Sequence, residues 1–156
     1  MTAVMRKDWV RALSAHPPAK VKALAQQLTA GAEVALVRLP QAGLGLLSLV
    51  DGALGEPYYL GEFPLSACGV RVSFPSGEAG EGGAQVLADD AELARAMAIL
   101  DAILAAKLPG WQRAAECVGD GELLNSEKDK RRRSMLAATR VDFSLLSNAE
   151  EDEDED

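Results

Sequence analysis

The sequence predicts an α+β fold in which an antiparallel β meander of four to five strands packs against N-terminal and C-terminal helices. Three observations indicate this class. Apolar residues recur at helical spacing near both ends of the chain, whereas the middle carries short runs rich in Val and Leu. Proline and glycine separate these runs. The order of helices, then strands, then helices disfavours a parallel, doubly wound sheet.

Two helices are predicted before the sheet. In residues 2–15, apolar side chains recur every four positions and form one face, made of Met5, Trp9 and Leu13. The pair Pro17 and Pro18 ends this helix. A second helix is predicted over residues 19–28, and Gly31 suits the left-handed position that often follows a helix.

The first strands are predicted as a hairpin. Residues 34–39 and 44–50 are short runs rich in Val and Leu, and residues 40–43 between them contain the proline and glycine of a turn. Another turn follows, after which residues 57–60 read as a short strand with both tyrosines.

The clearest strand signal is the alternation from Cys68 to Phe74, in which Arg71 faces water or a partner. A glycine-rich stretch over residues 77–83 is interpreted as a plain turn, and residues 84–88 as one more strand. A phosphate-binding loop is disfavoured, because the glycine spacing does not match such a motif and two glutamates would repel phosphate.

Two helices are predicted after the sheet. The first covers residues 90–107, begins at a capping Asp89 or Asp90, and has an apolar stripe of Leu93, Met97, Leu100 and Leu104. A final helix is predicted over residues 127–138, with Gly119 and Gly121 interrupting helical structure before it.

Charge and length predict one domain over residues 1–148 and a disordered acidic tail over residues 149–156. The formal net charge is -8, but seven acidic residues lie between Glu150 and Asp156, so the rest of the chain is nearly neutral. A nearly neutral body argues against nucleic-acid binding. We expect a cytoplasmic protein, since no apolar run is long enough to span a bilayer and the first residues do not resemble a signal peptide.

The side chains that could carry chemistry are few. Cys68 and Cys117 match no metal-ligand spacing and are interpreted as reduced, buried side chains. His16 is the only histidine and is interpreted as a helix-end residue, so no metal or catalytic site is predicted around it. Among the carboxylates, Glu62 is the one to inspect first. The full set of carboxylates available for a catalytic pair is Glu56, Glu62, Glu78, Glu81, Asp89 and Asp90.

A basic cluster lies in the last predicted helix, at Lys128, Lys130, Arg131, Arg132 and Arg133. It could be a solvated helix face that attracts the acidic tail, or a surface that binds phosphate-rich ligands or an acidic partner. The segment that follows this helix, Arg140-Val141-Asp142-Phe143, places a large apolar side chain beside two charges. Phe143 there needs the domain itself or another chain to bury against.

Several segments in order along the chain resemble the PhnG family, subunits of the carbon-phosphorus lyase core complex. The resemblance is carried by the opening helix with Trp9, Leu60-Gly61-Glu62, the strand through Val70-Arg71-Val72, Leu100-Asp101-Ala102, and above all Arg140-Val141-Asp142-Phe143. It implies an interface role for residues 140–143. The candidate interface residues are Arg140, Val141, Asp142, Phe143, Arg71 and Glu62.

The resemblance also implies partners and chemistry. It implies assembly with PhnI, PhnH and PhnJ, and a reaction in which a phosphonate displaces adenine from MgATP to give ribose 1-phosphonate 5-triphosphate. It places the catalytic groups on PhnI, and an iron-sulfur cluster with S-adenosylmethionine on PhnJ, so this chain would hold no cofactor. Two alternatives stay open: a free-standing enzyme or ligand-binding domain that uses Glu62, and an interaction module that binds a basic partner through its tail.

Overall fold

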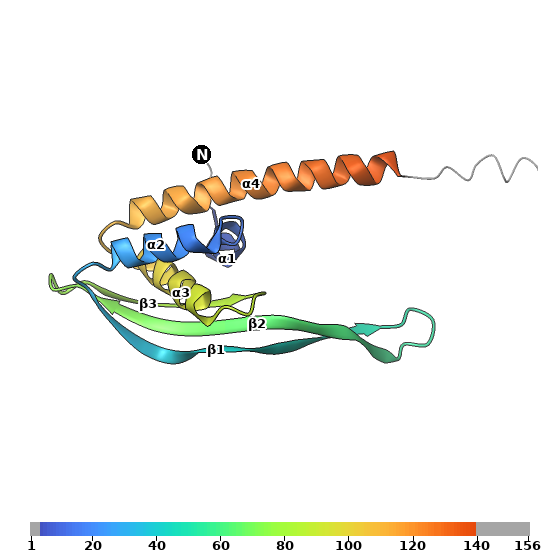
Figure 1. The fold of residues 1–156 in the computed structure, drawn as a ribbon, viewed down its shortest axis with the longest axis horizontal. Coiled ribbons are helices and arrows are strands. Elements are labelled where there is room, and N and C mark those ends of the chain that lie inside the picture. Colours follow the sequence, from blue (N-terminus) through green and yellow to red (C-terminus); the bar gives the residue numbers. More distant parts are fainter. Residues whose placement is uncertain (1–3, 140–156) are drawn as a thin grey trace, which may run out of the picture. The chain divides into compact units, whose positions relative to one another are not determined.

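A computed structural model describes residues 4–139, and these form helices packed on one antiparallel sheet (Figure 1). The elements in order are η1 (Arg6–Asp8), α1 (Trp9–Leu13), α2 (Pro18–Leu28), β1 (Glu33–Val50), β2 (Pro57–Ser73), β3 (Ala79–Val86), α3 (Ala91–Ala105) and α4 (Trp111–Ala138). The α+β class is confirmed. The prediction of four to five strands is wrong, since the described residues form three, in the order β1-β2-β3.

The chain divides into two units, Met1–Leu124 and Asn125–Asp156. The first contains the sheet, helices α1 to α3 and the first half of α4. The described part of the second is the remaining half of α4, where all five residues of the basic cluster are exposed.

The strand count is lower because two predicted turns lie inside long strands. Pro40 falls in β1, at a register irregularity between Arg38 and Gln41. A proline is tolerated there because β1 is an edge strand, so its missing N–H costs no ladder bond on the outer side. The real hairpin turn comes later, where the Asp51 N–H donates to the Glu56 carbonyl at 2.9 Å.

The glycine-rich stretch was predicted to be a plain turn, and only its start is one. Gly77 has a φ of 96° at the turn, but Gly80 and Gly82 lie within β3. A Cβ on Gly82 would overlap backbone atoms of Ala98 and Ala102, so glycine here lets α3 lie directly on the strand. This close approach explains why a strand forms from residues of low strand propensity.

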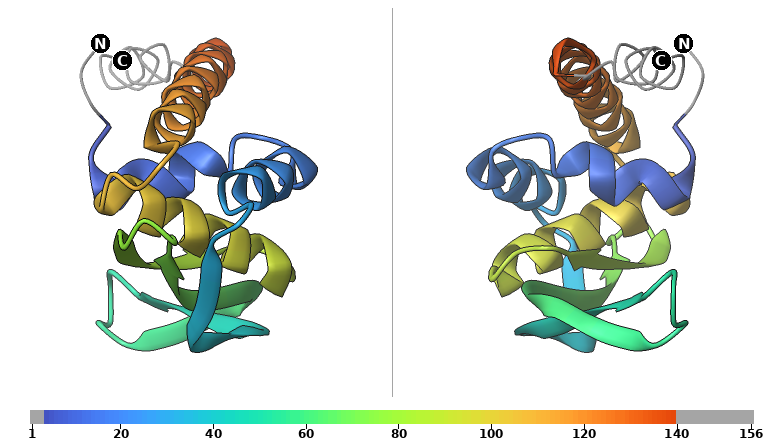
Figure 2. Two further views of the ribbon diagram at one scale, coloured as in Figure 1. Left: turned by 90° about the vertical axis from the view of Figure 1, so that its left-hand side faces the viewer. Right: turned by 90° about the vertical axis from the view of Figure 1, so that its right-hand side faces the viewer.

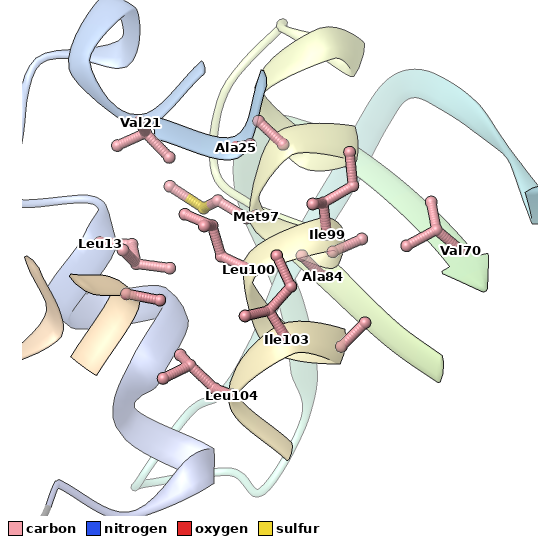
Figure 3. Packing of buried hydrophobic residues seen from close by; sticks show 14 of the residues in the cluster. Leu13, Val21, Ala25, Val70, Ala84, Met97, Ile99, Leu100, Ile103 and Leu104 are labelled. Carbon is pink, nitrogen blue, oxygen red and sulfur yellow. The ribbon is translucent and has the colours of Figure 1, made fainter. Parts of the chain in front are cut away.

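Helix α3 is the centre of the core. Its four-residue stripe is buried as predicted, together with most of its other side chains. Figure 2 shows α3 between the sheet and a second layer of helices, and Figure 3 shows Met97, Leu100 and Ile103 among side chains from the neighbouring elements. On the sheet side, Val70 and Val72 are fully buried, as the alternation from Cys68 predicts.

Helix α4 does not stop at its glycines, contrary to the sequence prediction. It runs unbroken from Trp111 to Ala138, through Gly119 and Gly121. Gly121 is buried, and a Cβ there would overlap the backbone of Ala12 in α1. The helix therefore tolerates this glycine because its bare Cα permits a close contact between two helices.

The residue that caps α3 is Asp90, one of the two that the sequence predicts for this position. Its Oδ1 accepts the Leu93 N–H at 2.9 Å, and its Oδ2 accepts the Lys22 ammonium at 2.7 Å. The hydrogen bond from Lys22, more than the backbone N–H groups, holds the pKa of Asp90 below its usual value, against the opposing effect of burial. This single carboxylate joins the start of α3 to α2.

Loss of this carboxylate is expected to destabilise the fold in a pH-dependent way. Because the folded pKa lies below the unfolded value of 3.8, the contribution is complete above that pH and disappears as the pH falls through the folded pKa. Asp90→Ala should lower the free energy of unfolding by about 1 kcal/mol at pH 7. Urea titrations at pH 7 and pH 3 should show this difference shrinking at the lower pH. An equal difference at both would contradict the assignment.

Candidate functional site

The hollow between α2 and α3 is the first place to look for a ligand site among the described residues. Its volume is about 210 Å³, which is smaller than typical ligand pockets of roughly 300–1,000 Å³. Lys22 on its wall is already bound to Asp90, and Arg95 lies 3.6 Å from Glu92. Within residues 4–139, no three His, Cys, Asp or Glu side chains gather closely enough to hold a metal ion.

The potential nucleophiles and the histidine are buried. Cys68 and Cys117 are free and buried, as predicted, and burial raises the pKa of both thiols, so both stay protonated at neutral pH. His16 is also buried. Its Nε2 donates to the Cys117 carbonyl at 2.8 Å, and its Nδ1 accepts from the Lys20 ammonium at 3.2 Å. The imidazole ring thus ties the segment that follows α1 to α4.

The most unusual surface is the outer part of the β1–β2 hairpin. We define the hairpin arm as residues 43–65, the part of the hairpin beyond the strand positions that pair with β3. In Figure 1 the two strands continue past the end of β3. Half of the exposed large apolar side chains in the described residues lie on this arm: Leu44, Leu46, Leu47, Leu49, Val50, Leu54, Tyr58, Tyr59 and Leu60.

Both faces of the hairpin arm are apolar. Residues that are opposite each other in an antiparallel pair point to the same face. Leu44 is opposite Pro64 on one face, and on the other face Gly45 is opposite Phe63, whose ring covers that glycine. The usual alternation of a polar and an apolar face is therefore missing from this segment.

The two described candidate interface residues lie in different places. Glu62 is exposed on the hairpin arm, opposite Leu46, and is surrounded by an apolar surface rather than a cleft. Arg71 is exposed on β2, where its Nη1 donates to the Glu81 carboxylate on β3 at 2.9 Å. Arg71 alternates along β2 with the buried Val70 and Val72. Arg71 and Glu81 therefore lie on the face of the sheet that points away from α3.

The remaining candidates, Arg140 to Phe143, lie outside the described residues. Their interface role, and those of Glu62 and Arg71, stay predictions. The acidic tail also lies outside the described residues.

Sequence reasoning missed two features of this molecule. The sequence contained a signal for the apolar hairpin arm in the adjacent leucines Leu46 and Leu47. Neighbouring residues of a strand point to opposite faces, so these two leucines cannot both face one core. Asp101 was visible as a single carboxylate within the apolar stripe of a helix. In the structure it is buried and binds Arg6 through two hydrogen bonds, of 2.8 and 3.0 Å, and also the Gly83 N–H at 3.0 Å.

Comparisons with known proteins agree on one family. The model of a family described as "Phosphonate metabolism protein PhnG" matches residues 4–148. The chain is also 39% identical over 121 residues to the "Alpha-D-ribose 1-methylphosphonate 5-triphosphate synthase subunit PhnG" of Rhizobium meliloti (strain 1021). That match covers 76% of this chain and 73% of the relative. Among the described helices, none is long and apolar enough to cross a membrane.

Proposed function

This chain belongs to the PhnG family, and from that membership we propose that it is an accessory subunit of a ribose 1-methylphosphonate 5-triphosphate synthase in phosphonate catabolism. In this role it works in a hetero-oligomer. We propose PhnI and PhnH as partners for the displacement of adenine from MgATP by a phosphonate, and PhnJ as a further partner. The catalytic groups, the MgATP site and the iron-sulfur cluster with S-adenosylmethionine then belong to those partners.

The exposed apolar hairpin arm is the observation that supports this proposal most. Soluble monomers rarely expose a contiguous apolar surface of more than a few hundred Å², whereas subunits of assemblies do so at their interfaces. The small hollow between α2 and α3 and the protonated, buried thiols agree with an accessory role. A chain that supplies an interface rather than a reacting group fits both sets of observations.

We expect the chain to co-purify with PhnI and PhnH from the same organism. With all three present, methylphosphonate and MgATP should yield adenine and ribose 1-methylphosphonate 5-triphosphate, detected by chromatography and phosphorus NMR. Omitting this chain should abolish adenine release. Full activity without it, or turnover of a substrate by the isolated chain, would overturn the accessory role.

A further inference from the structure

We propose that the hairpin arm, residues 43–65, docks into an apolar groove of a protein partner that contacts both faces of the arm and carries basic side chains at its rim. This inference rests on the proposed function, because it names the surface by which the subunit joins its assembly. It also specifies the chemistry of the surface that receives it.

The backbone of the hairpin arm is incompletely paired. The residues of β2 that precede Ser66 are not paired with β3. On the other side, β1 is an edge strand of the described sheet. Both edges of the arm therefore carry unpaired backbone groups. A two-stranded ribbon is marginally stable in water by itself, so a third surface that packs on it would stabilise it.

The size of the hairpin arm suits a stable protein interface. The eight residues from Gly43 to Val50 extend about 25 Å at ~3.4 Å per residue. A ribbon of this length, ~10 Å wide and ~10 Å thick with its side chains, presents on the order of 1,000 Å² over its faces and edges. A standard interface buries about 800 Å² on each partner. A groove that encloses the arm would reach this area, whereas contact with a single face would not.

The arm also carries side chains typical of energetic anchors. Tyr58 and Tyr59 are 47% and 67% exposed, and they pair with Leu49 and Ser48 across the strands. Neighbouring residues point to opposite faces, so each face of the arm has one tyrosine. Tyrosine is enriched among the residues that dominate binding energy at protein interfaces.

Charge indicates which occupant fits. The hairpin arm contains three carboxylates, Asp51, Glu56 and Glu62, and no lysine, arginine or histidine. An anionic lipid surface would repel it. A second copy that paired arm against arm would bring like charges together. A partner with basic residues around an apolar groove matches both the apolar surface and the charge.

The decisive test replaces apolar side chains on the arm in the full chain. In Leu44→Ser/Tyr59→Ser, both targets are exposed, by 69% and 67%, so the fold should survive. The matched control is Leu87→Ser, which changes a leucine that is 75% exposed between β3 and α3. We expect the double variant to raise the Kd for the PhnI–PhnH assembly at least a hundredfold and the control less than twofold, with unchanged circular dichroism for both.

A second pair of variants tests the charge of the groove. Glu56→Lys/Glu62→Lys should slow association with the same assembly at least tenfold at low salt, whereas Glu116→Lys on α4 should not. All three glutamates are exposed.

The outcomes separate this inference from the proposed function. If wild-type chain binds the assembly and the arm variants bind equally well, the arm inference is wrong and the proposed function stands. If wild-type chain binds none of the subunits, the proposed function fails first. Arm-dependent dimers in ultracentrifugation of the chain alone, or arm-dependent sedimentation with phosphatidylglycerol vesicles, would assign the arm to another occupant and overturn the inference.

Discussion

Replacing Gly82 with alanine is expected to destabilise the fold by about 3 kcal/mol, through overpacking between β3 and α3. A Cβ at this position would lie 2.8 Å from the Cα of Ala102 and even closer to backbone atoms of Ala98 and Ala102. Backbone atoms of a helix cannot rotate away as a side chain can. The helix would have to move off the strand, and the core beneath it would lose packing.

The adjacent glycine provides the control. At Gly83 a Cβ would meet only the Cys68 carbonyl oxygen, at an ordinary 3.6 Å, and the N–H that binds Asp101 would remain. Gly83→Ala should therefore change the free energy of unfolding by less than about 1 kcal/mol, with either sign. Urea denaturation followed by circular dichroism measures both variants. Equal midpoints for Gly82→Ala and the wild type would show that α3 does not lie directly on β3.

Asp101→Ala is the second large effect, and we expect it to cost about 2–3 kcal/mol of stability. The buried carboxylate accepts two hydrogen bonds from Arg6 and one from the Gly83 N–H. The hydrogen bonding between Arg6 and Asp101, and then the opposite charge of Asp101, raise the pKa of Arg6 above its usual value. Removing the carboxylate leaves the Gly83 N–H without this acceptor and removes the ion pair between Arg6 and α3.

An exposed ion pair of similar length shows what burial contributes. Arg71 and Glu81 lie 2.9 Å apart, but their side chains are 54% and 59% exposed, whereas that of Asp101 is 9% exposed. Glu81→Ala should cost less than about 0.5 kcal/mol. Thermal unfolding of the two variants in parallel measures the difference. If Asp101→Ala were as mild as Glu81→Ala, the Asp101 network would contribute no more than a surface pair.

Local structure was largely predictable from the sequence. The stripe of α3, its cap at Asp90 and the alternation from Cys68 to Phe74 are short-range patterns, and each is present in the structure. Such patterns depend on residues within one or two turns of a helix or a few strand positions. The segments that carry the resemblance to the PhnG family were also readable, because residue order alone identifies them.

Two glycine predictions and one proline prediction were wrong for a common reason. Gly82, Gly121 and Pro40 were all expected to break secondary structure. In the structure, Gly82 and Gly121 mark places where two backbones come close, and Pro40 lies on a free strand edge. Whether such a residue breaks an element or permits a contact depends on neighbours that are distant in the sequence.

Residue order was enough to identify the fold class, most helices, the core-facing side of β2 and the family. Three features became evident only in the folded molecule: β1 and β2 extend beyond β3, this extension is apolar on both faces, and Asp101 binds Arg6, which is 95 positions away. The difference lies in how far apart along the chain the interacting residues are. Secondary structure follows from spacing between near neighbours, whereas burial, exposure and long-range hydrogen bonds depend on which elements cover one another in space.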